Sequence, residues 1–237
     1  MILSETTAVV LAGGLGTRLR SVVGDRPKAL ASICEKPFLS YLLDQLYQTG
    51  IRYTVLCTGY LGDMVQAFYG ANYEAMTLAH SKEHLPLGTG GAIRFAQNLV
   101  KSDHVLVMNG DSYCSADLNK FWQWHVEKKS NATLLLTHVP NVGRYGQIKT
   151  AKNGALEDFL EKGVEHGPGW INAGVYFLSR DFIESIPSGR SVSLEKEIFP
   201  KWIGRNIYGY QSEGSFIDVG VPEDYEKAEE FFKGITS

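Results

Sequence analysis

Residues Leu11–Lys28 read LAGGLGTRLRSVVGDRPK and directly follow the apolar run Ala8–Leu11. An apolar run that passes straight into a glycine-rich stretch predicts a buried strand that ends in a loop. Gly13, Gly14 and Gly16 lack a Cβ, so the loop backbone can adopt unusual φ values and bring several N–H groups close to one anion. We therefore predict that this loop binds phosphate.

Two cations of different shape accompany the loop. Arg18 carries a planar guanidinium fork that matches two phosphate oxygens, whereas Lys28 is a compact point charge that can follow a phosphate whose geometry changes during a reaction. The pair indicates phosphoryl chemistry. A glycine turn without any ligand is the alternative for such a stretch taken alone.

Two other phosphate motifs fit the same glycines less well. A Walker A loop needs Lys and then Ser or Thr directly after its last glycine, but Gly16 is followed by Thr17 and Arg18. A dinucleotide fingerprint needs a small residue where Leu19 stands and an acid at the end of the second strand. The predicted second strand, Tyr53–Thr58, ends without one, so a nicotinamide dehydrogenase is disfavoured.

The motif G-x-G-T-R-L followed by R-P-K resembles the signature of the sugar-1-phosphate nucleotidylyltransferases, the NDP-sugar pyrophosphorylases. The commoner form of that signature has a proline and a threonine where this chain has Ser21 and Val23. In this respect the chain looks most like the D-glycero-D-manno-heptose 1-phosphate and mannose-1-phosphate guanylyltransferases. The resemblance covers nearly the whole chain.

Composition limits the classes of partner and compartment. The chain has 237 residues, 44% of them hydrophobic, and a net charge of −3 with acids and bases mixed, so we expect no nucleic-acid partner. Its three cysteines, Cys34, Cys57 and Cys114, suggest neither a disulfide framework nor a zinc site. Without a signal sequence or an apolar run of about 20 residues, we expect a soluble, cytoplasmic protein with no membrane partner. The oligomeric state stays open, a homodimer included.

Strand-like runs alternate with helix-period stretches, which predicts βαβ units and an α/β fold with a mainly parallel central sheet. Together with the resemblance, this pattern implies a three-layer α/β/α Rossmann-like nucleotidyltransferase fold. Residues 1–237 would form a single domain, with nucleotide bound by residues 1–115 and sugar phosphate by residues 116–237. The predicted strands are Thr7–Ala12, Tyr53–Thr58, Met76–His80, His104–Met108, Gly146–Thr150, Ala155–Leu160, Trp170–Leu178, Asn206–Gln211 and Phe216–Val219. The predicted helices are Phe38–Thr49, Gly62–Tyr69, Gly90–Leu99, Leu118–Lys128 and Pro222–Lys233.

Two aspartates end apolar runs and are candidates for metal ligands. Asp111 follows a predicted strand in Asn109–Asp111, and Asp218 ends the run that begins at Phe216. Two carboxylates with phosphate oxygens and water suit Mg²⁺, and both positions match the two metal aspartates of the family. Each aspartate could instead cap a turn or a helix.

A second glycine-rich turn, Leu87–Ala92, opens a predicted helix, whose N–H groups and dipole we expect to be available to a nucleotide. With Glu83 it looks like the base and ribose pocket of the family. A carboxylate can accept both adjacent N–H donors of guanine, so Glu83 favours GTP, although Glu83 could also be a surface loop residue. The predicted nucleotide-binding residues are Leu11, Ala12, Gly13, Gly14, Gly16, Thr17, Glu83, Gly88, Thr89, Asn109 and Gly110.

The resemblance also implies a sugar-phosphate site in the second half. Lys162 would contact the phosphate and Glu161 the sugar hydroxyls, although an exposed Glu-Lys pair is usually solvated surface. Asn172 is a polar amide inside a predicted core strand and needs partners, which the resemblance makes sugar hydroxyls. Gly146 would fit the same pocket through its backbone.

The implied reaction joins a nucleoside triphosphate and a sugar 1-phosphate. Lys28 would bridge the α-phosphate and the attacking phosphate, Arg18 would hold the departing pyrophosphate, and both are the predicted catalytic residues. GTP and the heptose 1-phosphate are the preferred substrates, with mannose or another hexose 1-phosphate and UTP, CTP or dTTP as alternatives. A glycosyltransferase that consumes nucleotide sugars and a non-catalytic nucleotide-sugar sensor are the alternatives from other classes.

Overall fold

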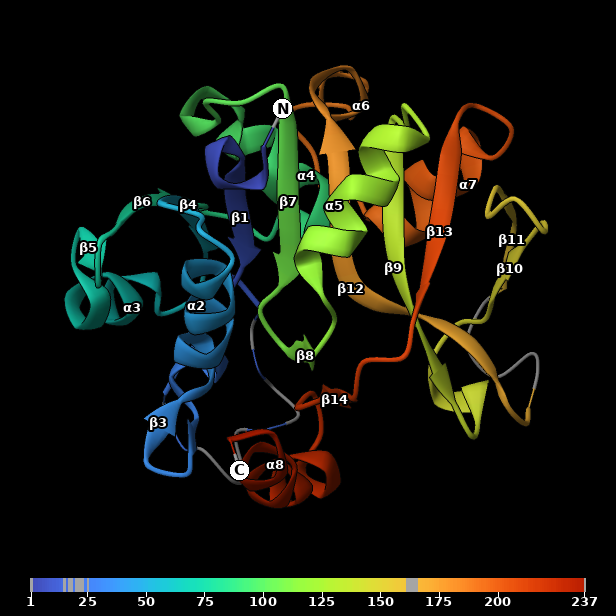
Figure 1. The fold of residues 1–237 in the computed structure, drawn as a ribbon. Coiled ribbons are helices and arrows are strands. Elements are labelled where there is room, and N and C mark those ends of the chain that lie inside the picture. The colour runs from blue at the N-terminus through green and yellow to red at the C-terminus, as the bar shows by residue number, and fades with distance from the viewer. Residues whose placement is uncertain are drawn as a thin grey trace.

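The computed structural model describes residues 2–14, 16, 19, 24, 26–160 and 166–236, and its centre is one eight-stranded sheet (Figure 1). The strand order is β13-β9-β12-β7-β1-β4-β6-β5. Strands β7, β1, β4 and β6 are parallel neighbours, whereas β12 runs antiparallel to both β7 and β9. The bounds of the strands are β1 (Thr7–Leu11), β4 (Tyr53–Thr58), β5 (Asn72–Tyr73), β6 (Met76–Lys82), β7 (His104–Asn109), β9 (Ala132–Val139), β12 (Gly169–Ser179) and β13 (Ile207–Ser212).

Helices cover both faces of this sheet. Figure 1 shows α2 and α5 in front of the sheet and α4 behind it. The described helices are α2 (Phe38–Gln48), α3 (Gly62–Tyr69), α4 (Gly88–Phe95), α5 (Leu118–Glu127), α6 (Arg180–Glu184), α7 (Phe199–Trp202) and α8 (Pro222–Thr236), with short helices η1 (Leu3–Glu5), η3 (Lys28–Leu30), η4 (Ala96–Leu99), η5 (Val142–Arg144) and η6 (Leu194–Ile198). None of the helices in these described ranges is long and apolar enough to cross a membrane.

Successive side chains of the central strands point to opposite faces of the sheet, so each face has its own hydrophobic core. In β1, Ala8 and Val10 belong to the buried cluster that includes residues of α2, α5 and α8, whereas Val9 belongs to the second cluster, which includes residues of α4 and α7. All three side chains are fully buried, as expected for a central parallel strand with helices on both sides. The predicted three-layer α/β/α fold with a mainly parallel sheet is therefore confirmed.

Three small two-stranded sheets complete the fold. They pair β2 (Ser32–Ile33) with β3 (Lys36–Pro37), β8 (Ser112–Cys114) with β14 (Phe216–Asp218), and β10 (Ile148–Thr150) with β11 (Leu156–Phe159). The last pair is the hairpin predicted from Asn153-Gly154: Gly154 has φ +85°, and the Asn153 side chain accepts a hydrogen bond from Ala155 N–H. Figure 1 shows β8 and β14 below the edge of the large sheet toward which β1 and β7 run.

The prediction omitted several elements. Strand β9 is the largest omission: its sequence ATLLLTHV places Thr133, Thr137 and His138 around three leucines, so it shows neither clear alternation nor the unbroken apolar run from which β1 was predicted. The short segments α6, α7 and η6 were also not predicted, since each is too short to establish a helical period. The predicted helix Gly90–Leu99 begins two residues earlier, at Gly88, and its last four residues form the tighter helix η4.

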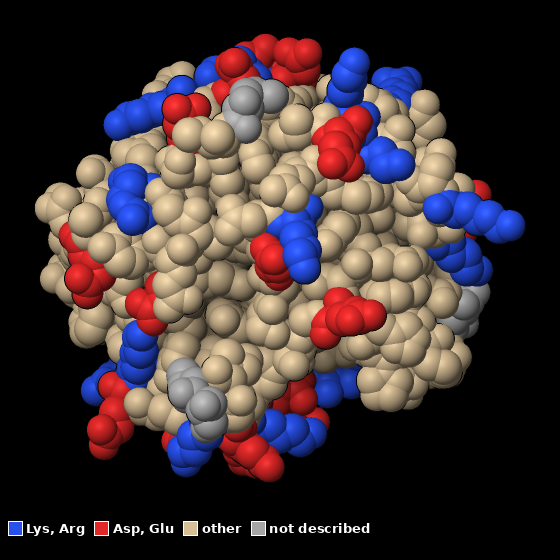
Figure 2. All heavy atoms as spheres, in the orientation of Figure 1, with Lys and Arg blue, Asp and Glu red and all other residues tan. Residues whose placement is uncertain are grey.

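The charged surface is mixed in sign on the face that Figure 2 shows. Lysine and arginine side chains alternate there with aspartate and glutamate over most of the visible outline. Local positive charge at the site described below therefore comes from individual side chains rather than from a broad basic surface.

Candidate functional site

A cavity of about 260 Å³ lies at the carboxyl ends of β1, β4 and β7. Its lining residues are Leu11, Ala12, Gly13, Gly14, Lys28, Ala29, Cys57, Glu83, Pro86, Gly88, Thr89, Ala92, Asn109, Gly110 and Asp111. Every described residue of the predicted nucleotide set lines this cavity except Gly16. Ligands of open α/β sheets bind at this edge, so the cavity is the candidate functional site.

Strand register brings the first lining residues together. Leu11 ends β1 opposite Cys57 of β4 and Asn109 of β7, so the three strands reach the cavity at the same level. Gly110 then passes so close to β1 that a Cβ on it would lie 2.6 Å from the Leu11 carbonyl oxygen. Only glycine allows this approach, and it places the following residue, Asp111, beside the loop.

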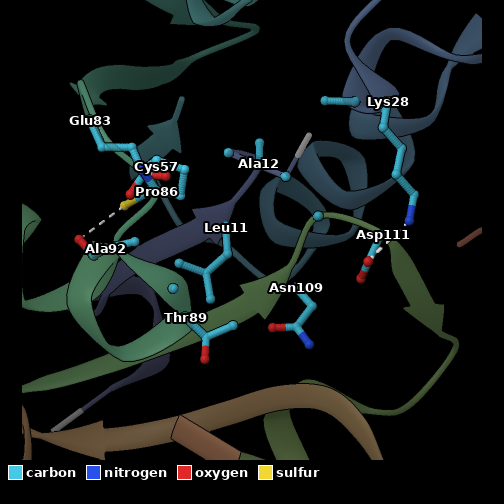
Figure 3. Close-up of a pocket in the computed structure, with 15 residues that line it drawn as sticks. Leu11, Ala12, Lys28, Cys57, Glu83, Pro86, Thr89, Ala92, Asn109 and Asp111 are labelled. Atoms are coloured by element: carbon cyan, nitrogen blue, oxygen red, sulfur yellow. Dashed lines mark hydrogen bonds and ion pairs between the residues drawn. The ribbon is translucent and has the colours of Figure 1, made fainter. Parts of the chain in front are cut away.

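Lys28 and Asp111 form an ion pair at one end of the cavity. Lys28 Nζ lies 3.0 Å from Asp111 Oδ2, and the lysine side chain is 11% exposed whereas the aspartate side chain is 45% exposed. The ammonium group therefore sits in a mostly enclosed position, while the carboxylate remains accessible to a ligand. Figure 3 shows this pair on the far side of Leu11 and Ala12 from Glu83.

Glu83 lies at the opposite end of the cavity. Its Oε2 accepts a hydrogen bond from Leu87 N–H at 3.2 Å, and burial raises the pKa of its carboxyl group. A Cβ on Gly13 or on Gly59 would lie 3.2 or 3.0 Å from Glu83 Oε1, so both glycines allow the backbone to approach the carboxylate. The Glu83 side chain is only partly exposed, which disfavours the alternative of a freely solvated loop residue.

Asn109 contributes a buried acceptor to the cavity. Its Oδ1 is shielded from solvent and has no hydrogen-bond partner among the residues that the structure describes. Buried polar atoms are normally hydrogen-bonded, so this oxygen is suited to accept a hydrogen bond from a bound ligand.

The second predicted metal ligand, Asp218, comes from a distant part of the chain. Strand β14 pairs with β8 so that Asp218 lies opposite Ser112, the residue after Asp111. Val219 N–H also donates to the Asp111 carbonyl oxygen at 2.9 Å. The structure thus brings the two aspartates to neighbouring positions, although Asp218 does not line the cavity.

Of the residues predicted to bind the sugar phosphate, the structure describes Gly146 and Asn172. Asn172 donates from Nδ2 to the Tyr176 hydroxyl at 2.7 Å and accepts from Gly174 N–H, so its side chain already has partners on its own strand. A Cβ on Gly146 would lie 2.5 Å from the Leu160 carbonyl oxygen, which explains the glycine by backbone packing. Neither Asn172 nor Gly146 lines the cavity. Four predicted residues lie outside the described ones: Thr17, Arg18, Glu161 and Lys162.

The expectation that the amides of the second glycine turn are available to a nucleotide is wrong for two of them. The N–H groups of Gly90 and Gly91 both donate to the Val192 carbonyl oxygen, at 2.9 and 3.2 Å. The physical reason is that the segment after α6 folds onto the start of α4 and supplies the acceptor. Gly88 and Thr89 still line the cavity.

Four lining residues were not predicted: Ala29, Cys57, Pro86 and Ala92. Cys57 is the last residue but one of β4 and lies opposite Leu11, so its place near a strand end was the available signal. Burial raises the pKa of its thiol to about 12, and Sγ lies 3.8 Å from the Ala92 carbonyl oxygen. The thiol is therefore protonated at neutral pH and acts as a packing group.

The nucleotidyl transferase family model matches residues 7–234. The chain belongs to the nucleotidyl transferase family. This confirms the resemblance drawn from the glycine loop. Among curated members of the family, a D-glycero-alpha-D-manno-heptose 1-phosphate guanylyltransferase from Aneurinibacillus thermoaerophilus is 38% identical over 223 residues, which covers 94% of this chain and 96% of the relative.

Two further matches are informative. A mannose-1-phosphate guanylyltransferase from Mycobacterium tuberculosis is 34% identical over 95% of this chain but is matched over only 64% of its own length. The crystal structure of HddC from Yersinia pseudotuberculosis complexed with GMP-PN superposes with a TM-score of 0.83 at 36% identity, covering 96% of this chain and 99% of HddC.

Proposed function

We propose that this protein transfers guanylyl from GTP to D-glycero-D-manno-heptose 1-phosphate, forming the GDP-sugar and releasing pyrophosphate. The observation that carries the proposal is the polarity of the cavity, which has an acceptor carboxylate at the Glu83 end and the cation Lys28 at the other. A guanine nucleotide has hydrogen-bond donors on its base and anionic oxygens on its phosphates, so its two ends match the two ends of this cavity. The named heptose and mannose guanylyltransferases and the HddC complex with GMP-PN support the same nucleotide.

In the proposed reaction a phosphate oxygen of the sugar 1-phosphate attacks the α-phosphorus of GTP in line. A bond forms between this oxygen and the α-phosphorus, and the bond from the α-phosphorus to the bridging oxygen of the β-phosphate breaks. The attacking oxygen is already ionised at neutral pH, so the step needs positioning and charge neutralisation rather than a general base. Lys28 supplies one of these charges from a mostly enclosed position, where screening by water is weak.

We propose that Asp111 and Asp218 hold a divalent cation, Mg²⁺. Asp218 ends β14 and Asp111 directly precedes its partner strand β8, so hard carboxylate oxygens that suit this ion come from neighbouring positions. The accessible Asp111 carboxylate can exchange its contact with Lys28 for one with the cation. When bound, the cation would neutralise charge on the crowded phosphate oxygens. Arg18 is proposed to hold the pyrophosphate, and Lys162 and Glu161 the sugar phosphate. In this arrangement residues 1–115 bind the nucleotide and residues 116–237 the acceptor.

Mannose 1-phosphate is the second candidate acceptor, because the Mycobacterium tuberculosis relative is named for it. A panel of GTP, ATP, UTP, CTP and dTTP against heptose, mannose and glucose 1-phosphates, with pyrophosphate release as the readout, tests both candidates. We expect the highest kcat/KM for GTP with the heptose 1-phosphate. A higher value with mannose 1-phosphate would replace the acceptor, and activity confined to a pyrimidine triphosphate would reject the guanine assignment. Exchange of labelled pyrophosphate into GTP separates this reaction from glycosyl transfer.

A further inference from the structure

Glu195 lies between the cavity and strand β12 and is not among the residues predicted from sequence. It belongs to η6, a five-residue π-helix from Leu194 to Ile198. Such helices are rare and occur frequently at functional sites. Three hydroxyl groups donate to its carboxylate: Thr89 and Ser193 to Oε2, each at 2.8 Å, and Tyr176 to Oε1 at 3.3 Å.

One side of this arrangement leads to the cavity. Thr89 lines the cavity, and its hydroxyl donates to Glu195 while accepting from Leu194 N–H at 2.9 Å. Both interactions together hold the Thr89 hydroxyl in one orientation. In Figure 3 the Thr89 side chain extends in the same direction as that of Asn109, the residue with the buried acceptor.

The other side leads to the predicted acceptor residue of β12. The fully buried Tyr176 donates to Glu195 and accepts from Asn172 Nδ2 at 2.7 Å. Between Asn172 and Tyr176 the pairing of β12 with β9 shifts register, and Gly174 adopts φ +76°. Asn172 still pairs with Leu136 of β9, and the bulge that follows it interrupts the ladder between Asn172 and Tyr176, whose side chains are hydrogen-bonded to each other across it.

The segment that carries Glu195 is firmly attached to the start of α4. Val192 accepts from the amides of Gly90 and Gly91, and its own N–H donates to the Leu87 carbonyl oxygen at 2.8 Å. Gly88 has φ +70°, and a Cβ on it would lie 2.6 Å from the Val192 carbonyl oxygen. The backbone therefore determines where the Glu195 carboxylate lies, and the carboxylate in turn orients the hydroxyls.

We propose that Glu195 is a positioning residue that links the nucleotide cavity, through Thr89, to the acceptor side, through Tyr176 and Asn172. The inference rests on the proposed function, because it assigns Thr89 to the nucleotide and Asn172 to the sugar phosphate. Hydrogen bonds to a charged acceptor are stronger than those between neutral groups. Loss of the Glu195 carboxylate therefore weakens the hydrogen bonds that orient Thr89 and Tyr176 at the same time. Loss of the Tyr176 hydroxyl removes the hydrogen bond to Asn172 on the acceptor side, and it also removes the contact of this hydroxyl with the Asn109 side chain, which lines the cavity.

Steady-state kinetics with both substrates varied tests this link. For Glu195→Gln we expect the KM values for GTP and for the sugar 1-phosphate both to rise by about tenfold or more, as expected for the loss of one charge-assisted hydrogen bond. For Tyr176→Phe we expect a rise in the KM of the sugar 1-phosphate and a smaller rise in the KM of GTP, because the Tyr176 hydroxyl also contacts Asn109 in the cavity. The matched control is Glu197→Gln, two residues along, whose carboxylate pairs with Arg190 at 2.9 Å on the outside of the segment. We expect wild-type constants for this variant.

The outcomes separate the link from a structural role and from the proposed function. A merely structural role lowers the active fraction, and hence kcat, without moving either KM; that result in a Glu195→Gln protein would overturn the inference. If Glu195→Gln does not fold, an unchanged sugar-phosphate KM in Tyr176→Phe would overturn it. Absence of pyrophosphate release by the wild-type protein with any substrate pair would reject the proposed function, and the inference with it.

Discussion

Replacing Lys28 by methionine separates the catalytic role of its charge from its role in stability. The substitution keeps the length of a side chain that is 11% exposed and removes the ammonium group 3.0 Å from Asp111. Loss of one preorganised charge at a site of developing charge lowers kcat by about 10²–10³-fold. Because Asp111 is 45% exposed and can be hydrated, loss of the ion pair costs about 1 kcal/mol or less of unfolding free energy. For a chain of this size that corresponds to a fall in Tm of about 2–4 °C at most.

The assay is pyrophosphate release at saturating GTP and sugar 1-phosphate, with Tm measured on the same preparations. Lys120→Met is the matched control, since Lys120 pairs with Asp117 on the exposed surface of α5 at 3.8 Å. We expect the control to retain wild-type kcat. A Lys28→Met protein whose kcat stays within about threefold of wild type would refute the assignment of this charge to the reaction. A fall in Tm far larger than that expected would show instead that Lys28 is needed to hold the fold.

Three further predictions follow from single contacts. Glu83→Gln replaces one acceptor oxygen by a donor amide, so kcat/KM for GTP should fall by about tenfold while kcat/KM for UTP, measured on the same preparations, stays unchanged. Equal losses with both nucleotides would contradict recognition of the guanine base by Glu83. Gly88→Ala adds a Cβ at φ +70° only 2.6 Å from a backbone carbonyl oxygen, whereas Gly189→Ala adds one at φ +75° in open space. Thermal unfolding should therefore show a cost of about 1–3 kcal/mol for the strained backbone in both and an additional cost in the first; equal Tm values would argue against the clash. Burial, with a smaller contribution from a neighbouring imidazole, lowers the pKa of His125 to about 3. An unfolded histidine titrates near 6.5, so as the pH falls from about 6.5 toward 3 the unfolding free energy of the protein should fall by about 1.4 kcal/mol per pH unit. Denaturant unfolding of wild type and of His125→Gln should therefore diverge in that pH range.

Much of the nucleotide side could be predicted from the sequence because its determinants are local. Gly13 and Gly14 follow an apolar strand, Asn109 and Asp111 follow another, and parallel strands place their carboxyl ends at one edge of the sheet. The spacing of the apolar residues distinguished the segments that form strands from those that form helices. Strand β9 was missed because its threonines and histidine interrupt the apolar run, so it showed neither alternation nor the unbroken apolar run that identified β1.

Contacts between distant segments had to come from the tertiary structure. Asp218 reaches the position beside Asp111 only because β14 pairs with β8, and no local pattern specifies that pairing. The Val192 carbonyl oxygen accepts hydrogen bonds from the Gly90 and Gly91 N–H groups. From the local sequence alone, these N–H groups at a helix start were expected to be available to a ligand.

The amino-acid order by itself thus determined the layered fold and most of the cavity lining, including Gly13 and Gly14 of the glycine-rich loop, because glycine geometry and apolar period act over a few neighbouring residues. Which polar groups meet beside the cavity, including Glu195 with Thr89 and Tyr176, was decided by the tertiary structure alone. The reason is that a hydrogen bond forms only when donor and acceptor lie within a few tenths of an ångström of the preferred distance. Thr89 and Glu195 are about a hundred residues apart in the sequence, so they reach this distance only after the sheet and its helices have packed.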